Sequence, residues 1–408
     1  MSHYLHIPHA EKFDPKKGAL LRTVFQVALA AGLLGTLITF IVSPVLGAHG
    51  WLFAFFYGFT LMVGCLFWTC LHHATDSEWS VVVRRQLENL SALLKWCGVI
   101  FVPLAIVAIY DSVRSFQSPS LLYQWMALNP EDTLLYGTKR YYLNHPFFWF
   151  RAVAFFGLLW WVSHVLRSRS IAQDKDGAAK HTFTLRKFAV AGIPTLAICL
   201  TFGGIDWLKA LNSHWYSTMW GVYLFAGAAG ASMALLILVC KWLQSVGYLK
   251  AVTLEHYHLM GKFLFAFTVF WAYIGFSQYM LITYANIDEE TIYFRVRNTG
   301  SWNWLNWFLV FGRFFFMFVP LLFQGLKKNR GIIFCAAWIL FMQFLDLFII
   351  IIPEYAPGGF SFPGLIACVF SLSAVVGILG LGFLKLLSQG HTFPIKDPRL
   401  AESLKFTN

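Results

Sequence analysis

The stretch LEHYHLMGKFLFAFTVFWAYIGFSQYM, residues 254–280, decides the fold. A helix needs about 20 apolar residues to cross about 30 Å of hydrocarbon, and the part after Lys262 is long and apolar enough to do so. The segment is nevertheless rich in groups that carry or exchange protons. At about 100° per residue, one stripe of a helix collects Glu255, His258, Lys262, Tyr273 and Ser277, with Gln278 on the far side. The stripe is either a route for protons or the anchored, interfacial foot of a membrane helix.

The rest of the chain repeats this apolar pattern. Of 408 residues, 58% are apolar and 12% charged, about half the charged fraction of a typical soluble domain. We therefore predict an all-α integral membrane protein. Its ten predicted spans are 20–42, 51–71, 93–110, 146–166, 188–208, 218–240, 259–282, 304–323, 331–352 and 364–387.

The distribution of lysine and arginine predicts the orientation. Most of them lie in the two tails and in every second connection, whereas the alternate connections hold few, as the positive-inside bias requires. We expect both termini to be cytoplasmic and the long connections 111–145 and 283–303 to face outward. The net charge of +12 is explained by this distribution, so it does not indicate nucleic-acid binding.

Several kinds of chemistry are not indicated by any motif. The seven cysteines show no CxxC or CxxCH spacing, and no histidine lies at the middle of a span, where a haem would need two. Nucleotide-binding and hydrolase motifs are also missing from the sequence. We predict no catalytic residue, no bound cofactor and no metal site in this chain.

Ionisable residues inside spans are costly and therefore mark candidate functional groups. Arg151 on the fourth span and Asp206 on the fifth lie at similar depth, and so do Arg313 on the eighth and Asp346 on the ninth. Because four spans separate the two occurrences, they predict two related four-helix units. Each pair either locks its bundle by neutralising two charges or places an aspartate at the outer end of a proton route.

The predicted domains follow from this repeat. They are a cytoplasmic tail (1–19), a peripheral first helix (20–50), a first four-helix bundle of spans 2–5 (51–217), a second of spans 6–9 (218–352), and a peripheral tenth helix with a cytoplasmic C-terminal tail (353–408).

The end of the second span, HHATDSEW at 72–79, is a polar run that we expect to be exposed. His72, His73 and Asp76 have a spacing that suits a metal, but no third fixed partner accompanies them. A proton-collecting mouth and a plain polar cap are the better interpretations, and His164 on the fourth span is placed to face this run.

These same stretches resemble a known family. HHATDSEWSVVVRRQLENL (72–90), FGGIDWLKALNSHWYST (202–218) and HLMGKFLFAFTVFWAYIGFSQ (258–278) are similar to the NrfD-type, polysulfide-reductase-type membrane subunits of bacterial alternative complex III, closest in kind to its second, shorter one, the F subunit. The resemblance extends over residues 20–360.

The resemblance implies a multi-pass subunit, in the bacterial inner membrane, of a quinol:cytochrome c oxidoreductase that can also pass electrons directly to a haem–copper oxidase. Menaquinol would be the substrate of the complex. Its expected partners are an NrfD-like C subunit, an iron–sulfur subunit with its clusters, and multihaem and monohaem cytochrome c subunits carrying haem c. The F subunit itself holds no cofactor, and proton half-channels are implied for it.

Carried onto this chain, the resemblance implies two groups of proton-path candidates. In the first bundle they are His72, His73, Asp76, Arg151, His164, Asp206 and His214, and in the second His258, Lys262, Tyr273, Ser277, Arg313 and Asp346.

Two other functions stay open. The chain could itself bind quinone in an aromatic-rich pocket, with Tyr273, His258 or Asp206 at the ring oxygens. It could also be a stand-alone secondary transporter, which the repeat permits, although the interrupted helices typical of transporters are few here.

Overall fold

The computed structural model describes residues 11–115, 118–127, 139–328 and 330–407. The predicted tail 1–19 and the predicted connection 111–145 are therefore only partly covered. Residues 1–10, 116–117 and 128–138 lie outside the described residues. Within the described ranges the chain is helical, apart from connections and one isolated β-bridge between Lys12 and His391.

The helices have the following bounds: η1 Pro15–Gly18, α1 Ala19–Val42, α2 Pro44–Ala74, α3 Val81–Ser91, α4 Leu94–Val113, η2 Gln124–Met126, η3 Lys139–Tyr141, α6 His145–Asp176, α7 Ala179–Trp207, η4 Lys209–Leu211, α8 Trp220–Ser245, α9 Leu254–Ala285, α10 Asp288–Arg297, α11 Gly300–Val310, the π-helical turn η5 Phe311–Phe315, α12 Phe316–Leu322, α13 Gln324–Lys328, α14 Gly331–Tyr355, α15 Phe362–Leu387 and α16 Leu400–Leu404.

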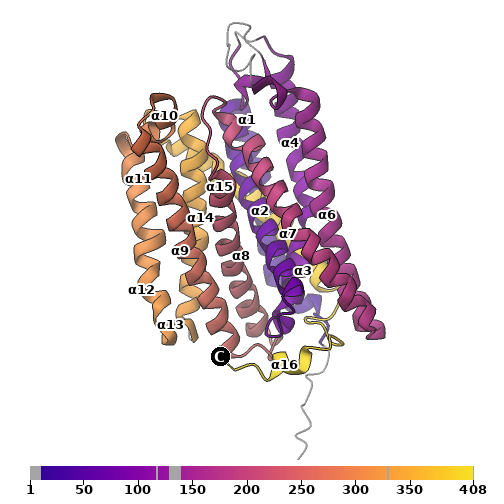
Figure 1. Ribbon diagram of the computed structural model, residues 1–408. Helices are drawn as coiled ribbons and strands as arrows, with labels where there is room; N and C mark the ends of the chain where they lie inside the picture. The colour runs from indigo at the N-terminus through magenta and orange to yellow at the C-terminus, as the bar shows by residue number, and fades with distance from the viewer. Residues whose placement is uncertain (1–10, 116–117, 128–138, 329, 408) are drawn as a thin grey trace, which may run out of the picture.

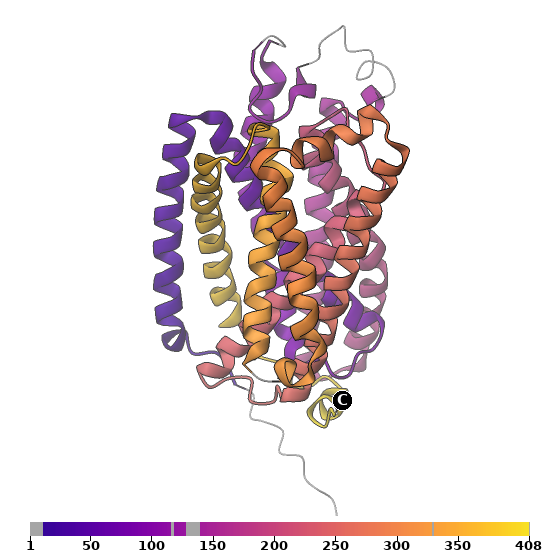
Figure 2. The same cartoon turned by 90° about the vertical axis from the view of Figure 1, so that its left-hand side faces the viewer.

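Ten helical segments in the described residues are long and apolar enough to cross a membrane, and each contains or closely matches one predicted span. The predicted all-α, multi-pass membrane fold is confirmed. The segments stand side by side as one bundle (Figure 1). One end of this bundle, which we call the terminal face, holds η1 and α16, and the opposite end, the loop face, holds α10 (Figures 1 and 2).

The spans pack as two rings of four. In the first ring α2 contacts α4, α4 contacts α6, α6 contacts α7 and α7 returns to α2. In the second ring the order is α8, α9, α11–α12 and α14, which returns to α8. Helices α1 and α15 pair with each other at the side of α2 (Figure 2). The two rings meet where α2 packs against α8, and α2 is the most buried of the spans.

Small residues permit the close approach of α2 to α8. A Cβ added at Gly64 would lie 2.3 Å from the backbone oxygen of Ala228 and 2.4 Å from Oγ of Ser232. Membrane helices in such close contact pack backbone against backbone and gain dispersion energy. This energy matters in lipid because the hydrophobic effect does not drive helices together there. The contact therefore fixes the two rings against each other.

The third span differs most from its prediction at 93–110. It begins at Val81, because α3 and α4 are almost continuous and together run to Val113. All eleven residues of α3 are buried, including Arg84, Arg85 and Glu88. A hydropathy pattern assigns such residues to a loop, but here the charges are paired inside the protein.

The connection predicted at 43–50 also differs. Ser43 alone separates α1 from α2. Its Oγ accepts a hydrogen bond from the N–H of Leu46 (3.4 Å), and Pro44 follows at the first helical position. A serine cap followed by proline is a strong helix start, so α2 begins seven residues before its predicted start.

Candidate functional site

The first predicted ion pair forms inside the first ring. Arg151 of α6 donates from Nε and Nη2 to the two carboxylate oxygens of Asp206 of α7, at 2.7 and 2.9 Å. Nη1 of Arg151 also donates to the backbone oxygen of Tyr142 (3.0 Å), and the guanidinium lies 3.9 Å from the centre of the Tyr142 ring. Asp206 is 1% exposed. This two-pronged geometry is the strongest arrangement that an arginine and a carboxylate adopt.

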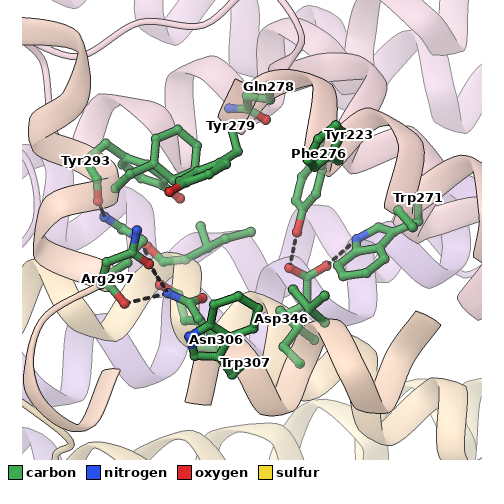
Figure 3. Close-up of a pocket in the computed structure, with 18 of the residues that line it drawn as sticks. Tyr223, Trp271, Phe276, Gln278, Tyr279, Tyr293, Arg297, Asn306, Trp307 and Asp346 are labelled. Atoms are coloured by element: carbon green, nitrogen blue, oxygen red, sulfur yellow. Dashed lines mark hydrogen bonds between the residues drawn. The ribbon is translucent and has the colours of Figure 1, made fainter. Parts of the chain in front are cut away.

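The second pair forms at the equivalent place in the second ring. Nη1 of Arg313, in the π-helical turn, donates to Oδ2 of Asp346 of α14 (2.7 Å). The carboxylate also accepts from the hydroxyl of Tyr223 (2.5 Å) and from Nε1 of Trp271 (3.0 Å), as Figure 3 shows. Nη2 of Arg313 donates to Gln343 (2.7 Å). Asp346 is thus held by three donors from three different helices.

A third polar group, which sequence reasoning missed, lies near the terminal face. We call it the α3 cluster: His73, Arg84, Arg85, Glu88, Asp174 and Asp397. Glu88 is 0% exposed. Its carboxylate lies 3.1 Å from Nε of Arg85, 3.6 Å from Nε of Arg84 and 3.7 Å from Nε2 of His73. One buried carboxylate therefore faces two guanidinium groups and an imidazole.

The α3 cluster balances its charge through two further acids. Arg85 donates to Asp174 of α6 (2.7 Å), and Arg84 pairs with Asp397 of the C-terminal segment. Several of its atoms have no hydrogen-bond partner among the described residues. They include both carboxylate oxygens of Glu88, Nε2 of His73 and both ring nitrogens of the neighbouring His72. Buried polar groups are normally hydrogen-bonded, so this concentration of atoms without a hydrogen bond, several of them held in ion pairs, marks the cluster as unusual.

The C-terminal segment closes the terminal face over this cluster. Residues 388–407 run beneath the bundle, and Asp397 accepts from Nε of Arg399 (3.1 Å), which itself donates to Asp76 (3.0 Å). The N–H of Ile395 donates to Asp174 (3.0 Å). Burial works to raise the pKa of Asp397, but Arg84 and Arg399 outweigh it and hold that pKa below its ordinary value. We call residues 388–407 the C-terminal strap.

The predicted stripe on α9 is only partly inside the protein. His258 is buried, but Lys262 and Tyr273 are exposed, and Tyr273 at 63% points to the surroundings of the bundle. The buried face carries Trp271 and Gln278 instead. The polar stripe is therefore not the buried face of α9, which is the face that places Trp271 against Asp346.

Two other candidates lie away from the buried groups. His164 is exposed on α6 and stacks on Trp160 with ring centres 5.5 Å apart, so it does not face the end of α2. Its neighbour Ser163 faces inward and donates to Ser91 (3.4 Å). His214 is exposed at the loop face and lines a polar pocket of about 490 Å³ together with His49 and Glu354.

The two histidines at the end of the second span are buried, whereas the sequence predicts an exposed run there. His72 and His73, expected in an exposed run, are 2% and 1% exposed. Asp76 does lie at the edge, paired with Arg186 and Arg399. Among the described residues, no group of three His, Cys, Asp or Glu is placed to hold a metal ion.

The sequence does contain a spacing of charged residues that could have indicated part of the α3 cluster. Arg84, Arg85 and Glu88 occur at i, i+1 and i+4, the spacing of helical ion pairs. The strap partner Asp397 could not be found this way, because it lies more than 300 residues away in the chain.

Comparison with known proteins adds no identification. A scan against protein-family models and a search of curated proteins each found no match.

Proposed function

We propose that this chain is a cofactor-free, multi-pass subunit of a bacterial respiratory quinol:cytochrome c, or direct oxidase, oxidoreductase of the alternative complex III type. It would lie in the bacterial inner membrane with both termini cytoplasmic. It would support neighbouring subunits, which carry the iron–sulfur clusters and haems c, and conduct protons along buried polar groups. The family part of this proposal depends on the sequence resemblance.

The observation that carries the proton-conducting part is the recurrence of one buried Arg–Asp pair in each ring of helices. Ionisable groups inside a membrane are expensive, and proteins keep them mainly where they serve a function. Asp206 and Asp346 occupy corresponding helices, α7 and α14, on the loop-face side of their spans. The repetition supports a shared role for the two pairs.

The α3 cluster supplies protonatable groups toward the opposite face. Glu88 and His73 lie 3.7 Å apart, and their atoms that have no hydrogen bond are of the kind that ordered water satisfies in protein interiors. Water between such groups can pass protons to and from them. In the proposed arrangement, Glu88 and His73 serve the cytoplasmic half of a route and Asp206 the outer half.

Purification from the native membrane tests the assignment to a complex. Mild detergent extraction of the tagged full chain should bring with it subunits that show the absorbance of haem c and an iron–sulfur protein. Recovery of the chain alone, under conditions that leave other respiratory complexes intact, would contradict the proposal and favour a stand-alone transporter.

A further inference from the structure

A group of basic residues lies at the terminal-face end of the second ring, where α13 connects α12 to α14 (Figure 1). We call it the α13 cluster, and its members are Lys262, Lys327, Lys328 and Arg330. The two segments that hold it, 254–262 and 322–330, contain one acid, Glu255. Glu255 lies 2.5 Å from Lys328 and neutralises that lysine. The cluster therefore carries an excess of positive charge.

Lys327 is the buried member of the cluster, with 7% of its surface exposed. Its stem packs on α9 at Gly261, where an added Cβ would lie 2.9 Å from Cγ of Lys327. An ammonium group has three donors. Nζ of Lys327 makes one hydrogen bond within the described part of the chain, a long one of 3.5 Å to the backbone oxygen of Leu322. Most of its hydrogen-bonding capacity is therefore unused.

The charge of Lys327 is not compensated by an acid. It forms no ion pair with any residue that the structure describes, and the charge that acts on it is that of another lysine, Lys262. Burial and this neighbour both lower the pKa of Lys327. A buried charge without a counter-charge is costly. The site thus favours an anion that comes from outside the chain.

Exposed apolar side chains continue from the cluster along the membrane-spanning surface. Leu322, Phe323 and Leu326 are exposed beside Lys327, and Phe316 and Val319 are exposed further along α12. On a helix that is apolar enough to span the membrane, such side chains face hydrocarbon. An anion with acyl chains would contact both the cations and this apolar surface, whereas a free phosphate ion would contact the cations alone.

We propose that the α13 cluster binds the phosphodiester headgroup of an anionic membrane phospholipid. The phosphate oxygens would accept hydrogen bonds from Lys327 and from the exposed Lys262 beside it, and the acyl chains would lie along α12. Basic pockets between spanning helices hold such headgroups in other membrane proteins. In the proposed orientation the lipid belongs to the cytoplasmic leaflet. The inference depends neither on proton conduction nor on the partners in the proposed function.

Photolabelling tests the site directly. The full chain, with any subunits that accompany it, is placed in phosphatidylcholine nanodiscs that contain a phosphatidylglycerol with a diazirine close to its headgroup. We expect saturable labelling within 254–262 and 316–328, displaced by unlabelled dioleoylphosphatidylglycerol but not by inorganic phosphate. Lys327→Met, which keeps an apolar stem, and Lys262→Gln should each weaken the labelling about fivefold, the effect of one lysine close to anionic lipid. Because Lys262 is exposed, Lys262→Gln tests the site even where Lys327→Met does not fold.

Two further variants separate a built site from a general attraction of basic residues to anionic lipid. Gly261→Val removes no charge but displaces the stem of Lys327, so labelling should fall as it does in Lys327→Met. Lys180→Gln combined with Lys187→Gln is the matched control for Lys262→Gln combined with Lys327→Met. It removes two exposed lysines at the beginning of α7, in the first ring, and should label like the wild type.

Three results would overturn the proposal. They are absence of label from the two segments, an equal loss of label in the site variants and in the α7 control, and displacement by inorganic phosphate, which would identify a site for a soluble anion. Equal displacement by dioleoylphosphatidylcholine would also overturn it, because the headgroup charge would then play no part. Specific labelling of a chain that purifies without haem-containing partners would refute the proposed function and leave this site standing.

Discussion

Nη1 of Arg313 lies 2.7 Å from Oδ2 of Asp346, and Nε of Arg151 lies 2.7 Å from Oδ2 of Asp206 at the equivalent place in the other ring. Each pair joins the span that runs toward the terminal face to the next span, which runs back. Each ring thus has one Arg–Asp pair at this place, between corresponding helices.

Replacing one partner of a buried ion pair should destabilise the fold more than replacing both partners. Asp346→Leu leaves the guanidinium of Arg313 buried and unpaired, which we expect to cost about 3–5 kcal/mol. Arg313→Met combined with Asp346→Leu should recover most of this loss, because no buried charge remains. The half-lives of the folded, detergent-solubilised variants on heating, followed by loss of helical circular dichroism, measure the difference.

The exposed pair Arg295–Asp288 is the control for this experiment. Its atoms are 2.9 Å apart, but Asp288 is 88% exposed, and surface pairs contribute about 0–1 kcal/mol. Asp288→Leu should therefore leave the half-life near that of the wild type. A double variant as unstable as Asp346→Leu alone would show that the Arg313–Asp346 pair does not act as a unit.

Gly64→Ala should loosen the contact between the rings. The new Cβ would meet backbone at 2.3 Å, so α2 and α8 would have to separate, at a cost typical of overpacking, about 1–3 kcal/mol. We expect a melting temperature several degrees lower. Gly157→Ala, on an open helix surface, should leave it unchanged or raised. Equal melting temperatures for the two variants would mean that α2 and α8 do not touch as described.

The C-terminal strap should weaken in acid. Because the pKa of Asp397 in the folded protein is lowered, its contribution to stability is fully present above the unfolded pKa of about 3.9 and is lost as the pH falls toward the folded value. We expect protease cleavage within 388–407 to be slow from pH 7 to pH 5 and to accelerate below about pH 4. An acid-stable protease such as pepsin suits the low-pH measurements.

Asp397→Asn should expose the strap already at pH 7, and its cleavage should change less below pH 4. Asp288→Asn, which alters an exposed carboxylate, should behave like the wild type. Cleavage of Asp397→Asn that is slow at pH 7 and rises in acid as in the wild type would show that Asp397 does not anchor the strap.

Hydropathy alone was enough to locate all ten spans, because each contains a long apolar stretch, but it missed the beginning of the third span at Val81. The Arg–Asp contacts were predictable too, since a lone charge in a span needs a partner and only one acid lies at the right depth. Both pairs are present as expected.

Other features depend on contacts between distant parts of the chain. Arg84, Arg85 and Glu88 have the composition of a loop, and the acids that pair with the two arginines from outside α3, Asp397 and Asp174, lie far away in the chain. The sequence of α9 alone does not show which of its faces is buried either. The buried face carries Trp271, whose indole donates to Asp346, and this hydrogen bond forms only once α14 is in place. The π-helical turn at Phe311–Phe315 is likewise not indicated by any pattern in its own sequence.

The ratio of protons moved to electrons transferred tests the central claim most directly. The purified complex that contains this chain is reconstituted in vesicles and supplied with a water-soluble quinol analogue, with Asp346→Asn and the control Asp288→Asn beside the wild type. If Asp346 belongs to a proton route, Asp346→Asn lowers the ratio while the complex stays assembled, and Asp288→Asn does not. An unchanged ratio in an assembled Asp346→Asn complex would contradict the account and leave the pair as a lock between helices.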